Sequence, residues 1–398
     1  MNQDVVLKVK EKFVAQYRKG YPLLVKEAFQ DLSALKEEGQ LVTLVDSKGN
    51  FICKGYYGKQ NKGYGWVLTP QQSEPIDQAF FTKQLAKAFA FRAPFFKNTE
   101  TTAFRIFNGE GDGVGGLTID YFDGFLLVNW YSLGIYQFKE VILQALNTVT
   151  EFKGIYEKKR FDTKGQYIED DDFVAGERAT FPLVIKENGV QFAVYLNEGA
   201  MVGIFLDQRD VRKRLREAYS HDKTVLNTFS YTGAFSVFAA LGGATQTTSV
   251  DLANRSRKKT EEQFLLNGVH LDAQVILVED VFNYFKYAGR KGLTFDTVVL
   301  DPPSFARSKK VTFSAEKNYT GLLKEAIALT KKGGTILAST NASSFNMKKF
   351  KQFIDQAFKD SQHKYKLQET YSLPEDFKTT ANFPEGDYLK VCFIQKLT

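Results

Sequence analysis

In the second half of the chain, short apolar runs alternate with longer segments whose apolar positions recur every three or four residues. The short runs are typical of buried strands and the longer segments of amphipathic helices. Strand, helix, strand, helix is the order expected of a doubly wound parallel sheet, so we predict an α/β fold here. The predicted strands are residues 224–229, 246–250, 275–278, 297–300, 335–339 and 388–395, with a helix over 234–241.

The first 190 residues have a different rhythm. Alternating apolar and polar positions at 41–45 and 51–57, with the turn 46–50 between them, predict a β-hairpin in a small, basic, β-rich module. Further elements are expected as helices at 77–91 and 135–149 and strands at 104–107 and 125–130, with the acidic run 169–172 as an exposed loop. We therefore predict three domains, residues 1–72, 73–190 and 191–398.

A glycine-rich segment, Gly111-Asp112-Gly113-Val114-Gly115-Gly116, satisfies the pattern G-x-G-x-x-G. A dinucleotide-binding loop with this pattern must open a helix. Residues 117–121 instead have the composition of a strand. We therefore predict a glycine turn between two strands, without a nucleotide.

Four consecutive strands in the second half end next to Gly233, Asp251, Asp280 and Asp301. The carboxyl ends of parallel strands share one edge of the sheet, where ligands bind, so these residues should line one crevice. Asp251 is placed to accept both hydroxyls of a ribose, and Asp280 to accept from an adenine amino group while Val281 packs on the ring.

The segment Asp301-Pro302-Pro303-Ser304-Phe305 follows the fourth of these strands. Proline stops the ladder, so the turn presents carbonyls and the Phe305 ring, which suit a flat, hydrogen-bonding nucleobase. The turn 230–233 lacks the three glycines of a pyrophosphate loop, which argues against NAD and favours a sulfonium nucleoside. Arg209 could bind its carboxylate; alternatively, Arg209 and Arg212 form the polar face of a helix.

Composition adds constraints to this picture. The 398 residues carry a formal net charge of +7 with a pI of about 9.0, which favours a polyanionic partner. The two cysteines, Cys53 and Cys392, lie in strand-like runs and suit neither a disulfide framework nor a metal site, so we expect no metal. Without a signal sequence or a long apolar run, we expect a cytoplasmic protein that does not enter a membrane.

Five motifs together resemble a known family. They are Gly109-Glu110-Gly111-Asp112-Gly113 with 117–120, Phe205-Leu206-Asp207-Gln208-Arg209, residues 227–236, Asp301-Pro302-Pro303, and residues 383–390. Across nearly the whole chain the sequence resembles the cytosolic 23S ribosomal RNA methyltransferases. The resemblance implies a C-terminal Rossmann-like class I methyltransferase domain, preceded by a small β-rich PUA-like RNA-binding domain and a central α+β domain. It also implies methyl transfer from S-adenosyl-L-methionine to a base of 23S ribosomal RNA.

The resemblance and the strand ends together define the expected site. The expected cofactor-binding residues are Phe205, Gln208, Arg209, Phe229, Ser230, Tyr231, Thr232, Gly233, Asp251, Asp280, Val281 and Asp301. The expected residues around the reacting base are Asp301, Pro302, Pro303, Ser304, Phe305 and Asn341. Basic residues of the first domain, with Lys153, Lys158, Lys159 and Arg160, are expected to hold RNA phosphates.

One position departs from the resembled family. Many of its members methylate cytosine C5 and carry the required cysteine in a Ser-Cys-Ser turn after the fifth strand. Here that turn is Thr340-Asn341-Ala342-Ser343, and an amide cannot act as that nucleophile. The chain looks more like a relative that methylates guanine N7, whose lone pair needs only alignment with the methyl group. Cytosine C5 transfer and an inactive RNA-binding relative stay as alternatives. The target nucleotide, the form of the RNA and the oligomeric state, a homodimer included, are left open.

Overall fold

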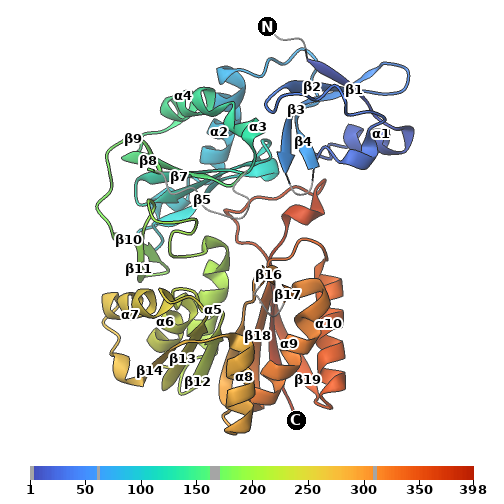
Figure 1. Ribbon diagram of the computed structural model, residues 1–398. Coiled ribbons are helices and arrows are strands. Elements are labelled where there is room, and N and C mark those ends of the chain that lie inside the picture. Colours follow the sequence, from blue (N-terminus) through green and yellow to red (C-terminus); the bar gives the residue numbers. More distant parts are fainter. Residues whose placement is uncertain (1–3, 61–62, 162–170, 308–311) are drawn as a thin grey trace. The chain divides into compact units, whose positions relative to one another are not determined.

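The computed structural model describes residues 4–60, 63–161, 171–307 and 312–398 (Figure 1). Contacts divide the chain into two compact units. Unit 1 comprises Met1–Ile185, Tyr195–Val202 and Glu375–Gly386, and unit 2 comprises Lys186–Val194, Gly203–Pro374 and Asp387–Thr398. The division into three domains at 72 and 190 stays a prediction. No helix among the described ranges is long and apolar enough to cross a membrane.

The amino-terminal part of unit 1 is a four-stranded sheet with a short helix. The order is β1-β2-β3-β4, and β1 pairs parallel with β2 while the other pairs are antiparallel. The predicted hairpin is confirmed, because the Asp46 carboxylate accepts from the backbone N–H of Lys48 and Asn50 in the turn. The elements are β1 (Val5–Lys8), α1 (Glu11–Arg18), β2 (Leu41–Val45), β3 (Phe51–Gln60) and β4 (Gly63–Thr69).

The rest of unit 1 is built on a five-stranded sheet of order β5-β6-β7-β8-β9. Asp77 caps the first helix by accepting from the backbone N–H of Phe80. The single helix predicted over 135–149 is wrong, because the chain breaks at Gln137 and Phe138 into two helices. The elements are α2 (Gln78–Phe91), β5 (Ala103–Asn108), β6 (Leu117–Phe122), β7 (Phe125–Trp130), α3 (Leu133–Tyr136), α4 (Lys139–Val149), β8 (Gly154–Lys159) and β9 (Phe173–Gly176).

The glycine-rich segment 111–116 is a turn between β5 and β6, as predicted. Packing explains its glycines. A Cβ on Gly115 would lie 2.1 Å from the Trp66 ring, and a Cβ on Gly111 would lie 1.9 Å from the carbonyl oxygen of Lys378. The turn is therefore a close-packed junction that also receives residues from near the end of the chain.

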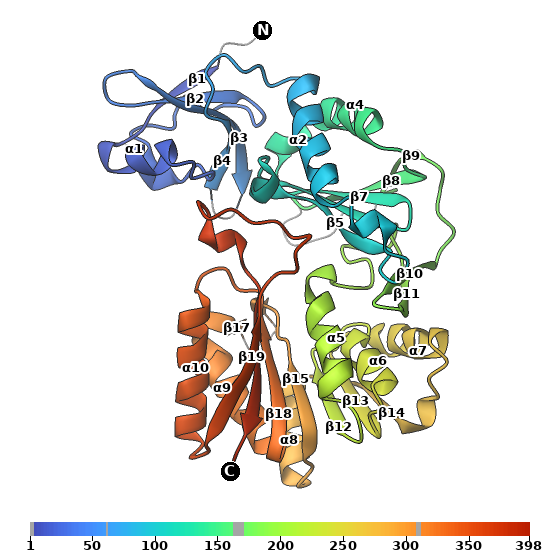
Figure 2. The ribbon, with the colours of Figure 1, turned by 180° about the vertical axis from the view of Figure 1, so that it is seen from behind.

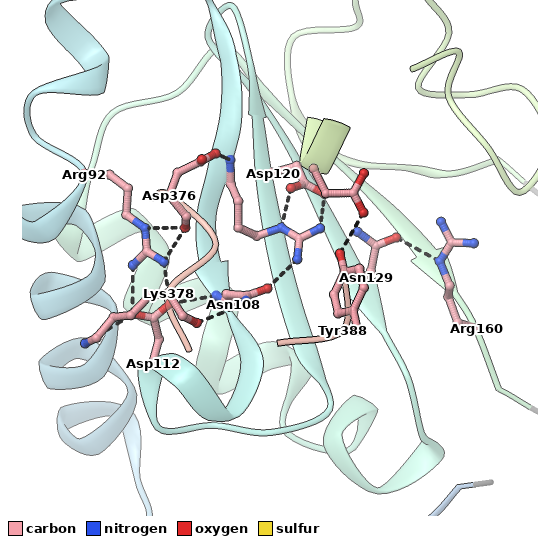
Figure 3. A network of polar contacts seen from close by, with 11 residues as sticks. Arg92, Asn108, Asp112, Asp120, Asn129, Arg160, Asp376, Lys378 and Tyr388 are labelled. Carbon is pink, nitrogen blue, oxygen red and sulfur yellow. Dashed lines mark hydrogen bonds and ion pairs between the residues drawn. The ribbon is translucent and has the colours of Figure 1, made fainter. Parts of the chain in front are cut away.

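A buried ion-pair cluster lies beside this turn (Figure 3). The Arg92 guanidinium is fully buried and donates to both oxygens of Asp112, at 2.7 and 2.8 Å. It also donates twice to the backbone carbonyl of Asp376, whose carboxylate accepts from the backbone N–H of Arg105. These bonds fasten the segment 375–386, which lies between β19 and β20 in the sequence, into unit 1.

Two expectations about charged residues near β8 are wrong. Asp172, expected in an exposed acidic loop, is buried and forms an ion pair with Lys158. Lys158, expected to hold phosphate, is itself 1% exposed, and burial lowers the pKa of its ammonium. Residues 169 and 170 of the acidic run lie outside the described residues. A lysine buried against an internal carboxylate cannot reach RNA.

Unit 2 is built on a seven-stranded sheet of order β14-β13-β12-β15-β18-β20-β19. The first five of these strands are parallel, and β20 is antiparallel to both of its neighbours. The predicted doubly wound α/β fold is confirmed. The strands are β12 (Thr224–Thr228), β13 (Gln246–Asp251), β14 (Gln274–Val278), β15 (Phe295–Leu300), β18 (Thr330–Thr340), β19 (Tyr365–Tyr371) and β20 (Lys390–Lys396).

Helices cover both faces of this sheet (Figure 2). Alternate residues of one strand belong to different cores: Val298 and Leu300 pack with α8, α9 and α10, whereas Val299 packs with α5 and α6. The helices are α5 (Arg209–Ala218), α6 (Ala234–Leu241), α7 (Ser256–Leu266), α8 (Val281–Arg290), α9 (Ala315–Leu329) and α10 (Met347–Asp360). Two small hairpins complete the fold, β10 (Leu183–Glu187) with β11 (Val190–Val194) and β16 (Phe305–Arg307) with β17 (Thr312–Ser314).

Candidate functional site

The strand ends meet as expected. In the parallel register Thr228 lies opposite both Val250 and Leu300, so β12, β13 and β15 end at the same level. One residue further along, Asp251 of β13 lies opposite Val278, the last residue of β14, so β14 ends at nearly the same level. The segments that follow these strands therefore form one row along the carboxyl edge of the sheet, where open α/β folds bind ligands.

The turn after β12 is held in an uncommon backbone conformation. Phe229, Tyr231 and Gly233 have φ angles of 54°, 52° and 77°, and the first two are not glycine. The Thr232 hydroxyl donates to the carbonyl of Gly203 at 2.6 Å, which fixes the turn from the other side. Such conformations persist only where the surroundings impose them, and they cluster at ligand sites. This turn contains five of the expected cofactor residues, namely Phe229, Ser230, Tyr231, Thr232 and Gly233.

Asp251 closes that turn from the neighbouring strand. Its Oδ2 accepts from the backbone N–H of Tyr231 at 2.8 Å, and its Oδ1 accepts from that of Ala253 at 2.9 Å. An ionised carboxylate has about four acceptor positions, so capacity for two hydroxyl donors is left. The next residue, Leu252, is 62% exposed, which offers an apolar surface beside this strand end.

The third strand end has a structural role, the one that a single acidic residue after a strand most often has. Asp280 is the N-cap of α8, and its Oδ1 accepts from the backbone N–H of Asn283 at 3.1 Å. Val281, expected to pack on an adenine ring, is 3% exposed and packs in the core. Phe282 is only partly buried, and its ring lies 6.3 Å from that of Phe229.

The segment 205–209 reaches the same edge from the side of α5. Phe205 is 41% exposed, and its ring centroid lies 5.3 Å from that of Tyr231. Arg209 and Arg212 are both buried, so the alternative that they form an exposed polar helix face is wrong. Arg212 pairs with Glu187 at 2.7 and 2.8 Å and donates to the carbonyl of Phe205, which supports this segment from behind.

Asp301 lies at the centre of the edge in a polar cluster. Gln208 Nε2 lies 3.2 Å from both of its carboxylate oxygens and 2.8 Å from the Ser339 hydroxyl. Burial raises the pKa of Asp301 to about 6, against the opposing effect of the hydrogen bonds from Ser339 and Gln208. Asp207 raises it further through like charge, and its Oδ2 accepts from the Tyr388 hydroxyl at 2.8 Å.

The expected base-side residues also come together. The Ser304 hydroxyl donates to Oδ1 of Asn341, which joins the Asp-Pro-Pro turn to the turn after β18. The Phe305 side chain is 62% exposed, next to this pair in the sequence. Of the two prolines, Pro302 is buried and Pro303 exposed. A polar pair beside an exposed aromatic ring can both hydrogen-bond and stack on a nucleobase.

Three supporting residues were missed from the sequence. Ser339 accepts from Gln208, the Tyr319 hydroxyl donates to the Ser339 carbonyl at 2.8 Å, and buried Lys390 donates to the carbonyl of Ala342 at 3.0 Å. None has a local sequence signal, because each contacts a residue at least twenty positions away. Lys390 ends one of the family motifs, and that is the one indication the sequence held.

Both cysteines are unsuited to nucleophilic chemistry. Cys53 and Cys392 are buried in strands, and burial raises the pKa of each thiol to about 12. Cys392 pairs across the sheet with Ala338, three residues before Asn341, but it is 0% exposed.

The residues of the edge fit a sulfonium nucleoside. Among the residues that the structure describes, Gln208 Oε1 is a buried acceptor without a hydrogen-bond partner, and it lies beside Asp301. Asp251 has acceptor positions left over, and Phe205 and Leu252 expose apolar surface. These acceptors match hydroxyl and amino groups, and the apolar surface matches a flat ring.

Comparison with known proteins places the chain in a family. A family model for the S-adenosylmethionine-dependent methyltransferases matches residues 105–369, and a PUA-like domain matches residues 7–70. A Bacillus subtilis (strain 168) protein named "Putative ribosomal RNA large subunit methyltransferase YwbD" is 60% identical over 393 residues, 98% of this chain and 99% of that one. A Pseudoalteromonas translucida protein named "Ribosomal RNA large subunit methyltransferase I" is 32% identical, over 94% of each chain.

A solved structure extends the similarity to three dimensions. It is described as "SMU.776, a putative methyltransferase complexed with SAH", is 38% identical, and covers 98% of this chain and 100% of its own with a TM-score of 0.91. The predicted resemblance, fold class and cofactor are thereby confirmed. The chain belongs to the S-adenosylmethionine-dependent methyltransferase family and carries a PUA-like domain near its amino terminus.

Proposed function

We propose that this protein methylates a base of large-subunit (23S) ribosomal RNA, and that the acceptor atom is guanine N7. The relatives named above support the RNA substrate, since both bear the name of a large-subunit ribosomal RNA methyltransferase. The PUA-like domain and the net charge of +7 agree with a polyanionic partner. A cytoplasmic location follows from such a substrate.

The observation that carries the N7 assignment is the Ser304–Asn341 pair at the carboxyl edge. Cytosine C5 must be activated by a thiolate that adds to C6. Asn341 stands where that thiol is expected, and the two cysteines of the chain are both buried with raised pKa values. Guanine N7 has an in-plane lone pair and loses no proton on attack, so its methylation needs orientation and not a nucleophile.

S-adenosylmethionine, when bound, supplies an electrophilic methyl group on a sulfonium centre. We assign to Asp251 the ribose hydroxyls, and to the turn 229–233, with Phe205, Gln208 and Arg209, the rest of the nucleoside and its amino-acid part. Asp280 and Val281 would lie farther along the same edge. Asp301 would accept a hydrogen bond from the cofactor's amino group, since its carboxylate lies beside the orphan acceptor of Gln208.

On the base side, the chain's own residues would act by positioning. Phe305 would stack on the guanine, and Ser304 with Asn341 would hydrogen-bond its edge, so that N7 faces the methyl group. The carbonyls of the Asp301-Pro302-Pro303 turn, stiffened by the two prolines, would exclude water from one side. Alignment of this kind contributes through effective concentration, which falls off steeply when the reacting atoms are misplaced.

The test is methyl transfer to a ribosomal RNA fragment with mapping of the modified atom. RNA in which the target guanosine is replaced by 7-deazaguanosine has a carbon at position 7 and should accept no methyl group. Transfer to the deaza substrate at the wild-type rate contradicts the N7 assignment. No transfer to any large-subunit RNA, with normal binding of the RNA, favours the inactive RNA-binding alternative.

The cytosine alternative has its own test. The double replacement Cys53→Ala with Cys392→Ala should leave turnover within about twofold, since neither thiol takes part in the chemistry. RNA containing 5-fluorocytosine, which traps cysteine enzymes as covalent adducts, should not crosslink. Appearance of 5-methylcytosine, or loss of activity in the folded double variant, returns the chain to the cytosine branch of the family.

A further inference from the structure

We propose that three lysines at the start of α10, Lys348, Lys349 and Lys351, form a surface that holds phosphates of the RNA strand flanking the methylated base. This inference rests on the proposed function and adds to it a second RNA contact, located in unit 2. We name these three residues the α10 lysines.

The sheet topology places the α10 lysines at the catalytic edge. The strand β18 ends at Thr340, Asn341 follows it, and α10 begins six residues later at Met347. Asn346 caps the helix by accepting from the backbone N–H of Lys349 at 3.0 Å. The helix therefore starts at the edge where Asn341 lies and runs back along the sheet beside α9 (Figure 1). Lys348 and Lys349 are exposed there.

Lysines at this position oppose the helix dipole. The amino-terminal pole of a helix carries partial positive charge, so acidic residues are preferred in the first turn and lysines destabilise the helix. The neighbouring α9 follows this preference with Glu316 in its first turn, whereas α10 has no acidic residue there. The carboxylates of α10, Asp355 and Asp360, lie toward its other end.

The α10 lysines also lack carboxylate partners. Within the part of the chain that the structure describes, no ion pair within 4.0 Å joins any of them to a carboxylate, although other lysines of unit 2 form such pairs, as Lys331 does with Asp296 at 2.8 Å. Asp360 pairs with Lys324 of α9 instead, at 3.7 Å. Lys348 and Lys349 thus lie in the first turn and Lys351 at the start of the second, and the Lys349 ammonium also lies 5.4 Å from the centroid of the Phe353 ring. None of these contacts neutralises the positive charge of the three lysines.

An RNA backbone is the partner that this arrangement fits. Phosphate contacts by lysines fix the position of a nucleic acid, while base contacts select the nucleotide. The base-side pair Ser304–Asn341 lies at the same edge, so a strand whose base reaches that pair must carry its flanking phosphates past nearby surface. A contact between the α10 lysines and RNA phosphates explains why these charges are found at this end of the helix, although they destabilise it.

The experiment compares two double variants of the full chain. Lys348→Gln with Lys349→Gln removes two of the α10 lysines, and Lys359→Gln with Lys364→Gln removes two exposed lysines near the other end of the helix. Binding of a 23S ribosomal RNA fragment is measured over a range of salt concentrations, together with S-adenosylmethionine binding and the thermal midpoint. The first variant should bind RNA about 3- to 30-fold more weakly, with a salt slope shallower by about 1 to 2.

The matched control should bind RNA like the wild type. The thermal midpoint gives a second, opposite readout: it should stay or rise in the first variant, because lysines leave a positive pole. A wild-type salt slope in the first variant, or an equal loss of affinity in the control, overturns the α10 surface. If the wild-type protein itself neither binds nor methylates the RNA, the proposed function fails; if it does both, only the α10 surface is at stake.

Discussion

Both the Arg92 cluster in unit 1 and the Asp301 cluster in unit 2 include residues of sequence motifs. They differ in how completely their polar groups are hydrogen-bonded. The Arg92 guanidinium donates to both carboxylate oxygens of Asp112, to the Asp376 carbonyl and to the Ala88 carbonyl. Around Asp301, the Gln208 acceptor lacks a partner among the described residues, and Phe305 and Leu252 expose apolar surface. Saturated hydrogen bonding indicates a structural junction, and capacity left over indicates a ligand site.

The strongest test of the structural side is Arg92→Ala. It removes the bidentate partner of buried Asp112 and leaves only the more distant Lys378 ammonium, at 3.7 Å, and breaking a buried pair in this way destabilises a protein by about 3–5 kcal/mol. Chemical denaturation should show this loss. Arg18→Ala is the matched control, because the Arg18 ion pair with Asp46 is largely exposed on the arginine side and should cost less than about 1 kcal/mol. Equal losses of stability in the two variants would show that the Arg92 cluster is not the structural junction that we infer.

On the ligand side, Asp301→Asn should change how stability depends on pH. Since burial raises the pKa of Asp301 from 3.8 to about 6 in the folded protein, the folded state binds the proton more tightly than the unfolded state. The wild type should therefore lose stability relative to the variant as pH rises from about 4 to 6, by up to about 1.4 kcal/mol per pH unit, and the difference should be constant above about pH 7. Denaturation at pH 4, 5, 6 and 7.5 measures it. A difference independent of pH would show that the carboxyl is not desolvated.

Asp251→Ala should weaken S-adenosylmethionine binding by about 2–3 kcal/mol, through loss of charge-assisted hydrogen bonds and of the support to the Tyr231 amide. Calorimetry of cofactor binding gives the value directly. Asp280→Ala is the comparison at the next strand end. Its capping bond to Asn283 predicts a loss of stability of about 1 kcal/mol, with a smaller effect on the cofactor. If Asp280→Ala weakened cofactor binding more than Asp251→Ala, the ribose would be assigned to the end of β14 and not to that of β13.

Phe305→Ala should raise the activation free energy of methyl transfer by about 1–3 kcal/mol, the range that base stacking on an aromatic ring contributes. Turnover should fall accordingly. Because the side chain is 62% exposed, stability and cofactor binding should hardly change. Leu265→Ala, at the same exposure on α7, should alter none of the three quantities. Steady-state methyl transfer is measured with both variants. An unchanged rate for Phe305→Ala would show that its ring does not stack on the target base.

Local pattern predicted much of the fold, because its signals are local. The strand at 297–300 is a β-branched apolar run stopped by two prolines, and β15 ends at Leu300. The ordered series of strand ends gave the edge on which Asp251 and Asp301 lie. The helix break at Gln137 was missed because the apolar periodicity continues on both sides of it.

What failed in prediction depends on distant partners. Lys158 was expected to be free for RNA, but it is 1% exposed and binds Asp172, and charge runs say nothing about such pairings. Asp280 caps α8 through Oδ1, and its expected role toward a ligand stays a prediction.

The division of the chain into units has a consequence for its synthesis. The chain passes between the units at 185/186, 194/195, 202/203, 374/375 and 386/387. Each unit is therefore made of three separate segments of the sequence, and neither can be expressed as one continuous fragment. During translation at about 5–20 residues per second, roughly 10 to 40 s separate residue 185 from residue 375. Throughout that interval Arg92 lacks the Asp376 carbonyl, because the segment Glu375–Gly386 has not yet been synthesised. The contacts that Glu375–Gly386 makes in unit 1 can therefore form only after most of unit 2 has been synthesised.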